Sequence, residues 1–345
     1  MTVRTLTNRE LNRALLARQL LLERAEVPVP QALDLMGQLQ AQYAPSMYIG
    51  LWSRVAGLRR AAVTEALDAR TAVQGTLLRS TIHLVSAADY WPTAVAVRLA
   101  RRDWYARATR RDPAEFAAAA ARLEPALAGG PLRRKEIADL VGAELVNGVG
   151  LWLDLVRVPP SGTWERRRAD LYGLAEDWVG PGRATEADGV RLLAVRYLTG
   201  FGPASVAEFA NWAGLPAATA AAALEALPLR RFLAEDGADL FDLPDAPLPD
   251  ADTPAPARFL PTWDAMLLAH ARRAAILPEE HRSKVFHVKM PQSIGTFLVA
   301  GSVAGTWRYT VADGVTVQPF APLAPADRRA VQEEADRLAS FHRDS

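Results

Sequence analysis

The sequence predicts a mainly α fold with small β-hairpins, an α+β arrangement, and three observations lead to it. Residues 94–110 and 116–127 are rich in Ala, Leu and Arg, which are strong helix formers. Between residues 131 and 243 the order helix, helix, hairpin occurs twice. Beyond residue 257, short β-branched and aromatic runs separated by glycine turns predict a small β-rich module.

Length and composition indicate a globular protein of more than one domain. At 345 residues the chain is too long for one small core, and two or three domains are expected. Hydrophobic residues make up 50% and charged residues 23% of the chain, which is ordinary globular composition. No apolar run approaches the roughly 18 residues of a membrane span, and residues 1–10 lack the apolar stretch of a secretory signal. We therefore expect a cytoplasmic protein without membrane association.

The residue types exclude several kinds of chemistry. There is no cysteine, which excludes disulfides, thiolate metal sites and a cysteine nucleophile. The five histidines are scattered without a metal-binding spacing, so no metal and no cofactor are expected. Only three lysines occur, and the positive charge is therefore mostly arginine, which binds phosphate in a bidentate manner. A GC-rich genome would explain the same abundance of Ala and Arg.

The N-terminal region is predicted to begin with two helices. Thr7 and Glu10 have the spacing of a capping box, and a leucine stripe continues this helix to about Glu23. A second helix should cover residues 31–37. The β-branched residues within 74–85 predict a strand or hairpin.

The repeated order helix, helix, hairpin is that of a winged helix. One copy has short helices over residues 131–142 and 151–155, followed by two extended runs around a Ser-Gly turn within 156–164. The second copy occupies residues 186–243, with an Asp-Gly hairpin turn. A third, less regular copy would use residues 74–85 as its wing.

These units predict the domain organisation. Residues 245–256 are rich in Pro, Asp and Ala and are predicted to form a linker. A β-rich module follows and ends in a helix over residues 326–340. The predicted divisions are a first winged helix in residues 1–112, a second in 113–184, a third in 185–250, and the C-terminal module in 251–345.

Several short strings, in order along the chain, resemble the AlkZ/YcaQ-type family of winged-helix DNA glycosylases. They are QLQAQ at 38–42, RSTIHLV at 79–85, residues 202–215, LPTWD at 260–264 and GSVAGTWR at 301–308. The resemblance implies three tandem winged helices in a C-shaped arrangement that cradles DNA. It also implies excision of bulky N-alkylated purines, including interstrand crosslinks made by genotoxic natural products, as a form of DNA repair and self-resistance.

The family's catalytic signature in the AlkZ-like branch is a Gln-apolar-Gln triplet, which Gln38, Leu39 and Gln40 match. The resemblance therefore implies catalytic roles for Gln38 and Gln40. Alkylation of guanine N7 makes the base cationic and a good leaving group. Two amides are able to hold a water by donating and accepting hydrogen bonds, and fixing a nucleophile is worth several kcal/mol, up to roughly 7–11 kcal/mol.

Geometry limits where such a pair of amides is useful. On one helix, residues i and i+2 point about 200° apart and cannot share a water. Pro45 disfavours a helical conformation at Ala44. We therefore expect the helix to end near Gln38, with Gln38 and Gln40 facing one cleft. The alternative is that both are ordinary polar residues at a helix end.

Further residues are candidates for the walls of this site. Thr81 and His83 alternate on one strand face, as a supporting wall of the cleft or as structural residues. Arg101 and Arg102 lie on a basic helix that is either a DNA-contacting face or a solvated one. Arg166 and Arg167 follow the Ser-Gly turn, where a wing would reach phosphate.

Residues 282–289 are predicted to form a strand of a hairpin that enters a DNA groove beside the lesion. Its candidate DNA-binding side chains are Arg282, Lys284, His287 and Lys289. Phosphate contacts from such residues give an affinity that depends on salt and not on sequence.

The expected partner is double-stranded DNA carrying an alkylated purine, bound by a monomer. With three lysines in the chain, a monofunctional glycosylase that leaves an abasic site is favoured over a lysine-based lyase. Because a bulky adduct does not fit a snug pocket, we expect an open cleft and not a flipped base. The main alternative is a non-catalytic winged-helix regulator, since fold does not fix function. No nucleophile-elbow, metalloprotease, P-loop or dinucleotide motif supports another hydrolase or nucleotide enzyme.

Overall fold

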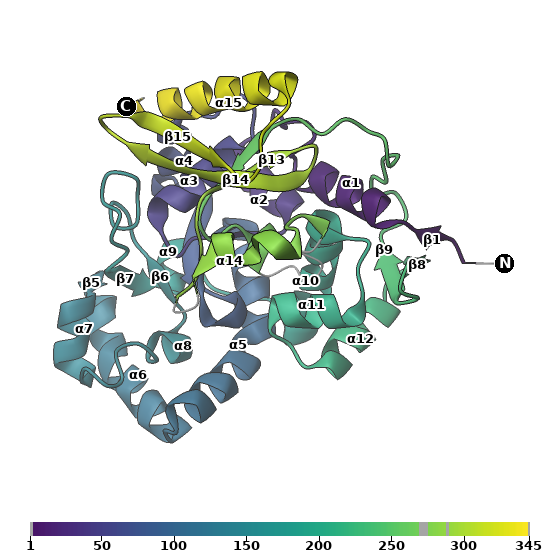
Figure 1. Ribbon diagram of the computed structural model, residues 1–345. Coiled ribbons are helices and arrows are strands. Elements are labelled where there is room, and N and C mark those ends of the chain that lie inside the picture. The colour runs from purple at the N-terminus through teal and green to yellow at the C-terminus, as the bar shows by residue number, and fades with distance from the viewer. Residues whose placement is uncertain (1–2, 269–274, 288–289, 344–345) are drawn as a thin grey trace.

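Helices and small sheets alternate along the whole chain, and the mainly helical α+β prediction is confirmed (Figure 1). The computed structural model describes residues 3–268, 275–287 and 290–343. In the described part of the chain, no helix is both long and apolar enough to pass through a bilayer.

The first helix starts as the sequence predicts and ends earlier. α1 (Asn8–Arg18) carries the complete capping box between Thr7 and Glu10. It was expected to reach Glu23, but Leu20 adopts the left-handed conformation (φ 57°), and the chain turns there. α2 (Val29–Met36) agrees with the predicted second helix.

A six-stranded antiparallel sheet forms the centre of the N-terminal half. Its strands are β2 (Leu39–Gln40), β3 (Ala72–Thr76), β4 (Ile82–Ser86), β5 (Leu132–Arg133), β6 (Leu155–Arg157) and β7 (Leu171–Leu174). They are ordered β2-β4-β3-β6-β7-β5, and a tight turn, η1 (Leu78–Ser80), joins β3 to β4. The sheet therefore joins strands from the predicted first and second units.

Helices cover both faces of this sheet. They are α3 (Ala44–Trp52), α4 (Arg60–Asp68), α5 (Ala87–Thr109), α6 (Pro113–Ala128), α7 (Arg134–Val141), α8 (Gly150–Leu153) and α9 (Ala175–Val179). Pro45 does not exclude Ala44 from a helix, because both residues lie in the first turn of α3, where a missing amide hydrogen costs no bond. The hairpin expected within residues 156–164 does not form there. Instead β6 pairs with β7, because Pro159 and Pro160 lack the amide hydrogens needed to continue the ladder directly after β6.

The third segment has the predicted helix, helix and hairpin. It contains α10 (Glu186–Phe201), α11 (Val206–Ala213), α12 (Ala217–Glu225), β8 (Arg230–Ala234) and β9 (Asp239–Asp242). The N-terminal strand β1 (Thr5–Leu6) pairs in parallel with β8. A fully buried ion pair between Arg18 in α1 and Asp242 in β9 strengthens this junction, with Nη1 and Oδ1 2.6 Å apart.

The C-terminal segment contains the predicted β-rich module and closing helix. Its elements are β10 (Arg258–Leu260), α13 (Ala265–Leu268), η3 (Glu279–His281), α14 (Arg282–Val285), β11 (Phe286–His287), β12 (Met290–Ser293), β13 (Thr296–Val299), β14 (Ser302–Thr310), β15 (Gly314–Pro319) and α15 (Pro325–Arg343). Strands β10-β13-β14-β15 form one sheet, across which α15 packs (Figure 1). The strand expected from residue 282 is wrong at its start, where α14 makes a helical turn.

Candidate active site

The chain leaves α2 through two consecutive left-handed residues. Gly37 has φ 76° and Gln38 has φ 73°, and together they turn the chain from the helix into β2. A Cβ at position 37 would also lie 2.9 Å from the carbonyl oxygen of Arg196. Both the left-handed backbone and this close contact therefore require glycine there. The prediction that the helix ends near Gln38 is confirmed, since its last residue is Met36.

The Gln38 side chain is fixed at one end only. Its Nε2 donates to Thr93 Oγ1 in α5 over 2.7 Å, and the residue is 3% exposed. Its Oε1 is buried and has no hydrogen-bond partner among the described residues. An unpaired buried amide oxygen is costly, so this atom is ready to accept a hydrogen bond from a bound molecule.

Gln40 lies on the same side of the sheet. It is paired opposite His83 of β4 and is 6% exposed. Residues alternate across a strand, so Gln40 and His83 share a face with Val85, which packs against Tyr90 of α5. Both glutamines are thus directed toward α5 and are largely covered. The open cleft around them stays a prediction.

His83 is buried among neighbouring groups of its own turn. Its Nδ1 lies 3.1 Å from the carbonyl oxygen of Thr81, and the Thr81 hydroxyl donates to the carbonyl of Leu78. Burial, with a smaller effect from the charge of Arg79, lowers the pKa of His83 to about 3. The imidazole is therefore neutral near physiological pH. His83 thus does not act as a protonated, charged acid there.

This pKa predicts a pH dependence of stability. Between the unfolded value of 6.5 and the folded value of about 3, the unfolded chain binds a proton that the native His83 does not bind. The free energy of unfolding should therefore fall as the pH falls, by up to about 2 kcal/mol between pH 7 and pH 5 for this residue. Urea unfolding of wild type and His83→Asn at both pH values measures this. Equal losses in the two proteins would contradict it.

Two features of the site were missed by sequence reasoning. Thr93 looks like any helical threonine in the sequence, and only the packing of α5 shows its contact with Gln38. Arg79 (φ 51°) donates to the carbonyl oxygen of Trp212 and packs against Gly214, which ties the β3–β4 turn to α11. Burial lowers the pKa of Arg79 to about 10, so the guanidinium stays charged at neutral pH.

An ionic cluster holds α2, α5 and α10 together beside this strand. Arg196 of α10 donates to both carboxylate oxygens of Asp89 (2.6 and 3.0 Å) and lies 3.2 Å from Asp34. Asp34 also accepts from the Ser86 hydroxyl over 2.7 Å. Burial raises the pKa of Asp34, and the nearby charge of Asp89 adds to the effect. The cluster positions the helix that carries Thr93.

Arg101 is held in the interior, which corrects the prediction that it contacts DNA, whereas Arg102 is half-buried and its contact with DNA stays a prediction. The Arg101 side chain is 3% exposed and binds Asp154 and the carbonyl oxygen of Thr76. Arg102 donates to the carbonyl oxygens of Leu151 and Trp152 over 2.9 and 3.0 Å. Arg101 therefore connects α5 to the sheet and to the end of α8, and Arg102 connects α5 to α8.

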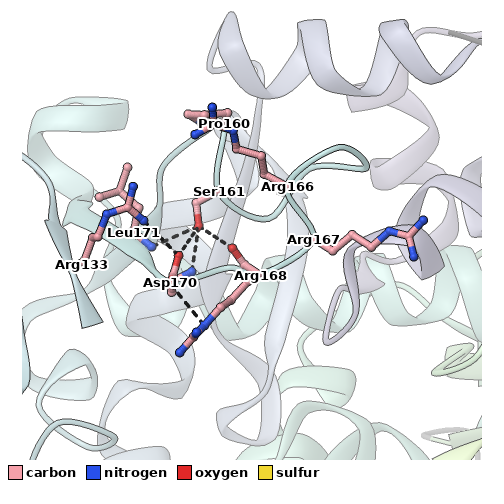
Figure 2. A pocket seen from close by; sticks show the side chains of 8 residues that line it. All are labelled: Arg133, Pro160, Ser161, Arg166, Arg167, Arg168, Asp170 and Leu171. Carbon is pink, nitrogen blue, oxygen red and sulfur yellow. Dashed lines mark hydrogen bonds and ion pairs between the residues drawn. The ribbon is translucent and has the colours of Figure 1, made fainter. Parts of the chain in front are cut away.

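Arg166 and Arg167 lie in the exposed loop between β6 and β7. Together with Arg133 and Arg168 they line a cavity of about 300 Å³ (Figure 2). Arg133 and Arg168 lie 3.6 and 3.3 Å from the carboxylate of Asp170. Arg167 points away from the other three and donates to the Tyr43 hydroxyl over 3.2 Å (Figure 2). Four arginines and one aspartate line this cavity and give it a positive charge, and its contact with DNA stays a prediction.

The predicted basic hairpin is only partly described. Arg282 is exposed and lies 3.2 Å from Glu279, and the Lys284 ammonium lies 4.8 Å from the centre of the Phe320 ring. Both belong to the helical turn α14, and not to the strand that was predicted for them. The backbone of His287 pairs with Met290 in β11–β12, and Lys289 lies outside the described residues. No group of described residues has the composition of a metal site.

Comparison with known proteins shows the family of the chain. The family described as DNA glycosylase AlkZ-like matches residues 33–341. The chain belongs to the AlkZ-like DNA glycosylase family. Among solved structures, the Streptomyces sahachiroi DNA glycosylase AlkZ is similar with a TM-score of 0.81 and 18% identity, over 97% of each chain. At this identity the likeness shows the fold. A search of curated proteins gave no match.

The match to the AlkZ-like family covers the segments described above. The matched residues include β2 with both glutamines, the ionic cluster and the arginine-rich loop. A DNA glycosylase acts on DNA, and the site is therefore to be sought on a surface that a duplex reaches. The division into three winged helices and the C-shaped arrangement stay predictions.

Proposed function

We propose that the protein is a monofunctional DNA glycosylase that hydrolyses the N-glycosidic bond of bulky N7-alkylated purines. One observation carries the proposal. In a chain of a DNA glycosylase family, the side-chain amide of Gln38 donates through Nε2 to Thr93, and its Oε1 has no hydrogen-bond partner in the described part of the chain. The role of Gln38 and Gln40 is to orient a water and not to take its proton, because an amide is not a base at neutral pH.

The reaction balances without a cofactor. The bond between the sugar C1′ and the purine nitrogen breaks, and its electron pair neutralises the cationic base. A water hydrogen bonds to Gln38 Oε1 with one O–H group, and its oxygen forms the new bond to C1′. The released proton goes to solvent. The leaving group needs no protonation, which agrees with the low pKa of His83.

The product and the substrate range follow from the same chemistry. The described lysines, Lys135 on α7 and Lys284 on α14, lie on elements other than those of the glutamine segment. We propose that the enzyme therefore leaves an intact strand with an abasic site. In interstrand crosslinks through guanine N7, the same glycosidic bond joins the sugar to a cationic base. Unhooking of crosslinks and self-resistance to a genotoxic natural product therefore belong to this proposal.

A base-release assay tests the proposed function. A duplex with N7-methylguanine is incubated with the protein, and the free base and alkali-labile strand breaks are measured. We expect both to appear, with no break before alkali. Binding of the duplex without release would support a non-catalytic DNA-binding protein instead.

Thr93 is expected to act as a positioning residue for Gln38. Thr93→Val keeps the side-chain shape but removes the acceptor for Nε2, so the amide loses its orientation. We expect the single-turnover rate of base release to fall about tenfold, which corresponds to 1.4 kcal/mol, with little change in duplex affinity. Thr93→Ser should restore the rate. Equal rates in Thr93→Val and wild type, or a serine variant as slow as the valine variant, would contradict this role.

A further inference from the structure

A small cavity of about 120 Å³ lies between the central sheet and the helices α7 and α8. The sheet contributes Thr76 of β3, Arg157 of β6 and Tyr172 of β7 to its lining. The helical side contributes Arg134 and Asn147. The other described residues that line the cavity are aliphatic or glycine, and none of them is acidic. The cavity therefore combines two positive charges with an apolar surrounding.

Arg157 brings a buried positive charge to this cavity. The residue is 8% exposed, and an arginine side chain stays protonated in proteins. Its Nη1 donates to the Thr76 hydroxyl over 2.6 Å, whereas its Nε is buried without a hydrogen-bond partner in the described part of the chain. The guanidinium lies 5.1 Å from the centre of the Tyr172 ring, which compensates a buried charge only in part. Burial lowers the pKa of Arg157, and the neighbours that oppose this effect are the phenols of Tyr172 and Tyr90, not a carboxylate.

The protein supplies no counter-ion to Arg157 from the residues that the structure describes. The carboxylate of Asp154, three residues earlier in the chain, is already shared by Arg98, 2.7 Å away, and by Arg101. A buried charge without a partner destabilises the fold. An anion that enters the cavity would remove this cost, and its binding would be favoured for that reason.

The groups around Arg157 are hydrogen-bond donors suited to an oxyanion. Arg134 is half-buried at the start of α7, and its Nη2 donates to Asn147 Oδ1 over 2.8 Å, which leaves the Asn147 amide nitrogen as a further donor. The Thr76 hydroxyl accepts from Arg157 and keeps its own hydrogen for another acceptor. Guanidinium groups match the geometry of phosphate oxygens. A volume of about 120 Å³ holds on the order of four waters, which is the size of a group with four oxygens.

The cavity lies on the other face of the sheet from Gln40. One row of paired residues across the sheet consists of Gln40, His83, Gly75 and Val156. Arg157 follows Val156 in β6, so its side chain points to the opposite face. The strand order β2-β4-β3-β6 puts β6 three strand spacings, roughly 14–15 Å, from β2. The cavity is therefore separate from the segment proposed to hold the water.

We propose that this cavity binds one phosphate-type oxyanion between Arg157 and Arg134. A backbone phosphate of DNA and free inorganic phosphate offer the same oxygens. Because Asn147 is exposed, the cavity opens to solvent on its side and admits either source. The proposal goes beyond the proposed function, since it involves neither the glutamine segment nor base release.

Inorganic phosphate is the probe that tests this site. It is titrated by isothermal calorimetry into wild type, Arg157→Met and Arg134→Gln, with the ionic strength held constant by chloride. We expect wild type to bind at one site with a dissociation constant of about 1 mM or lower. Arg157→Met keeps the apolar stem but loses the charge, and it should abolish binding. Arg134→Gln should weaken binding about tenfold.

Lys135→Gln is the matched control, because Lys135 is exposed beside Arg134 on α7 and is not among the lining residues. It loses the same charge and should leave the phosphate affinity unchanged. Circular dichroism checks the folding of Arg157→Met, and the comparison of Arg134→Gln with Lys135→Gln decides if that variant does not fold. Absence of phosphate binding to wild type, or equal affinities in Arg134→Gln and Lys135→Gln, would overturn the proposal.

A second titration, in the presence of saturating undamaged duplex, identifies the source of the phosphate group. Loss of free phosphate binding, together with a weaker duplex affinity in Arg134→Gln than in Lys135→Gln, would assign the site to a DNA backbone phosphate. Phosphate binding that persists in the complex, with equal duplex affinities of the two variants, would assign it to free phosphate. Both results support the oxyanion site.

Discussion

Replacing Gln38 and Gln40 together with alanine should slow base release from N7-methylguanine duplexes by roughly a thousandfold or more. Loss of a held nucleophile at a cost of about 4 kcal/mol gives this factor. Duplex affinity should change by less than about threefold, because both side chains are nearly buried, at 3% and 6% exposure, and contribute little surface to a phosphate contact. Single-turnover release and anisotropy titrations measure the two quantities.

Gln42→Ala is the matched control for this result. Gln42 is the third glutamine of the same segment, but it is exposed, and its Oε1 accepts from the Ile82 amide. Release should stay close to the wild-type rate in this variant. An unchanged rate in the double variant, or an equal loss in Gln42→Ala, would rule out the assigned role of the two amides.

The second large effect concerns stability, at the junction of the first helix with the third segment. Asp242 accepts from Arg18 Nη1 and Nη2 over 2.6 and 3.0 Å and from Arg230 Nη2 over 2.7 Å. The side chains of Arg18 and Asp242 are fully buried. Asp242→Asn leaves the Arg18 charge buried without a counter-ion, so we expect the free energy of unfolding to fall by about 3–5 kcal/mol.

Asp239→Asn on the same strand provides the comparison. Asp239 is exposed, and this substitution should change the free energy of unfolding by less than about 0.5 kcal/mol. Chemical denaturation of the three proteins measures the difference. Similar midpoints for the Asp242 and Asp239 variants would show that the buried ion pair does not stabilise the junction.

Local sequence signals predicted most elements of the fold. The capping box of Thr7 and Glu10, the Asp-Gly turn between β8 and β9, and the strands after residue 257 depend on neighbours along the chain, and sequence patterns record such neighbours well. The early end of α1 and the helical turn at Arg282 were missed, because packing outweighs weak local preferences there.

In the candidate site, too, local features were predictable from the sequence and long-range contacts were not. The Gln-Leu-Gln triplet was visible in the sequence, and so was the need for a helix end beside it. The partner of Gln38 was not, because Thr93 comes from a helix distant in sequence. Arg101 was predicted to contact DNA, and nothing local shows that Asp154 binds it in the interior. Long-range pairing of charges is a property of the fold and not of the local sequence.

The most direct test of the proposed mechanism is whether the two amides act on one water. Single-turnover rates are measured for Gln38→Ala, Gln40→Ala and the double variant with the same N7-methylguanine duplex. If both amides hold one nucleophile, either single substitution removes most of the benefit, and the double variant should be little slower than the slower single variant. A double variant whose loss equals the product of the two single losses would show that the amides act independently and would contradict the proposed mechanism.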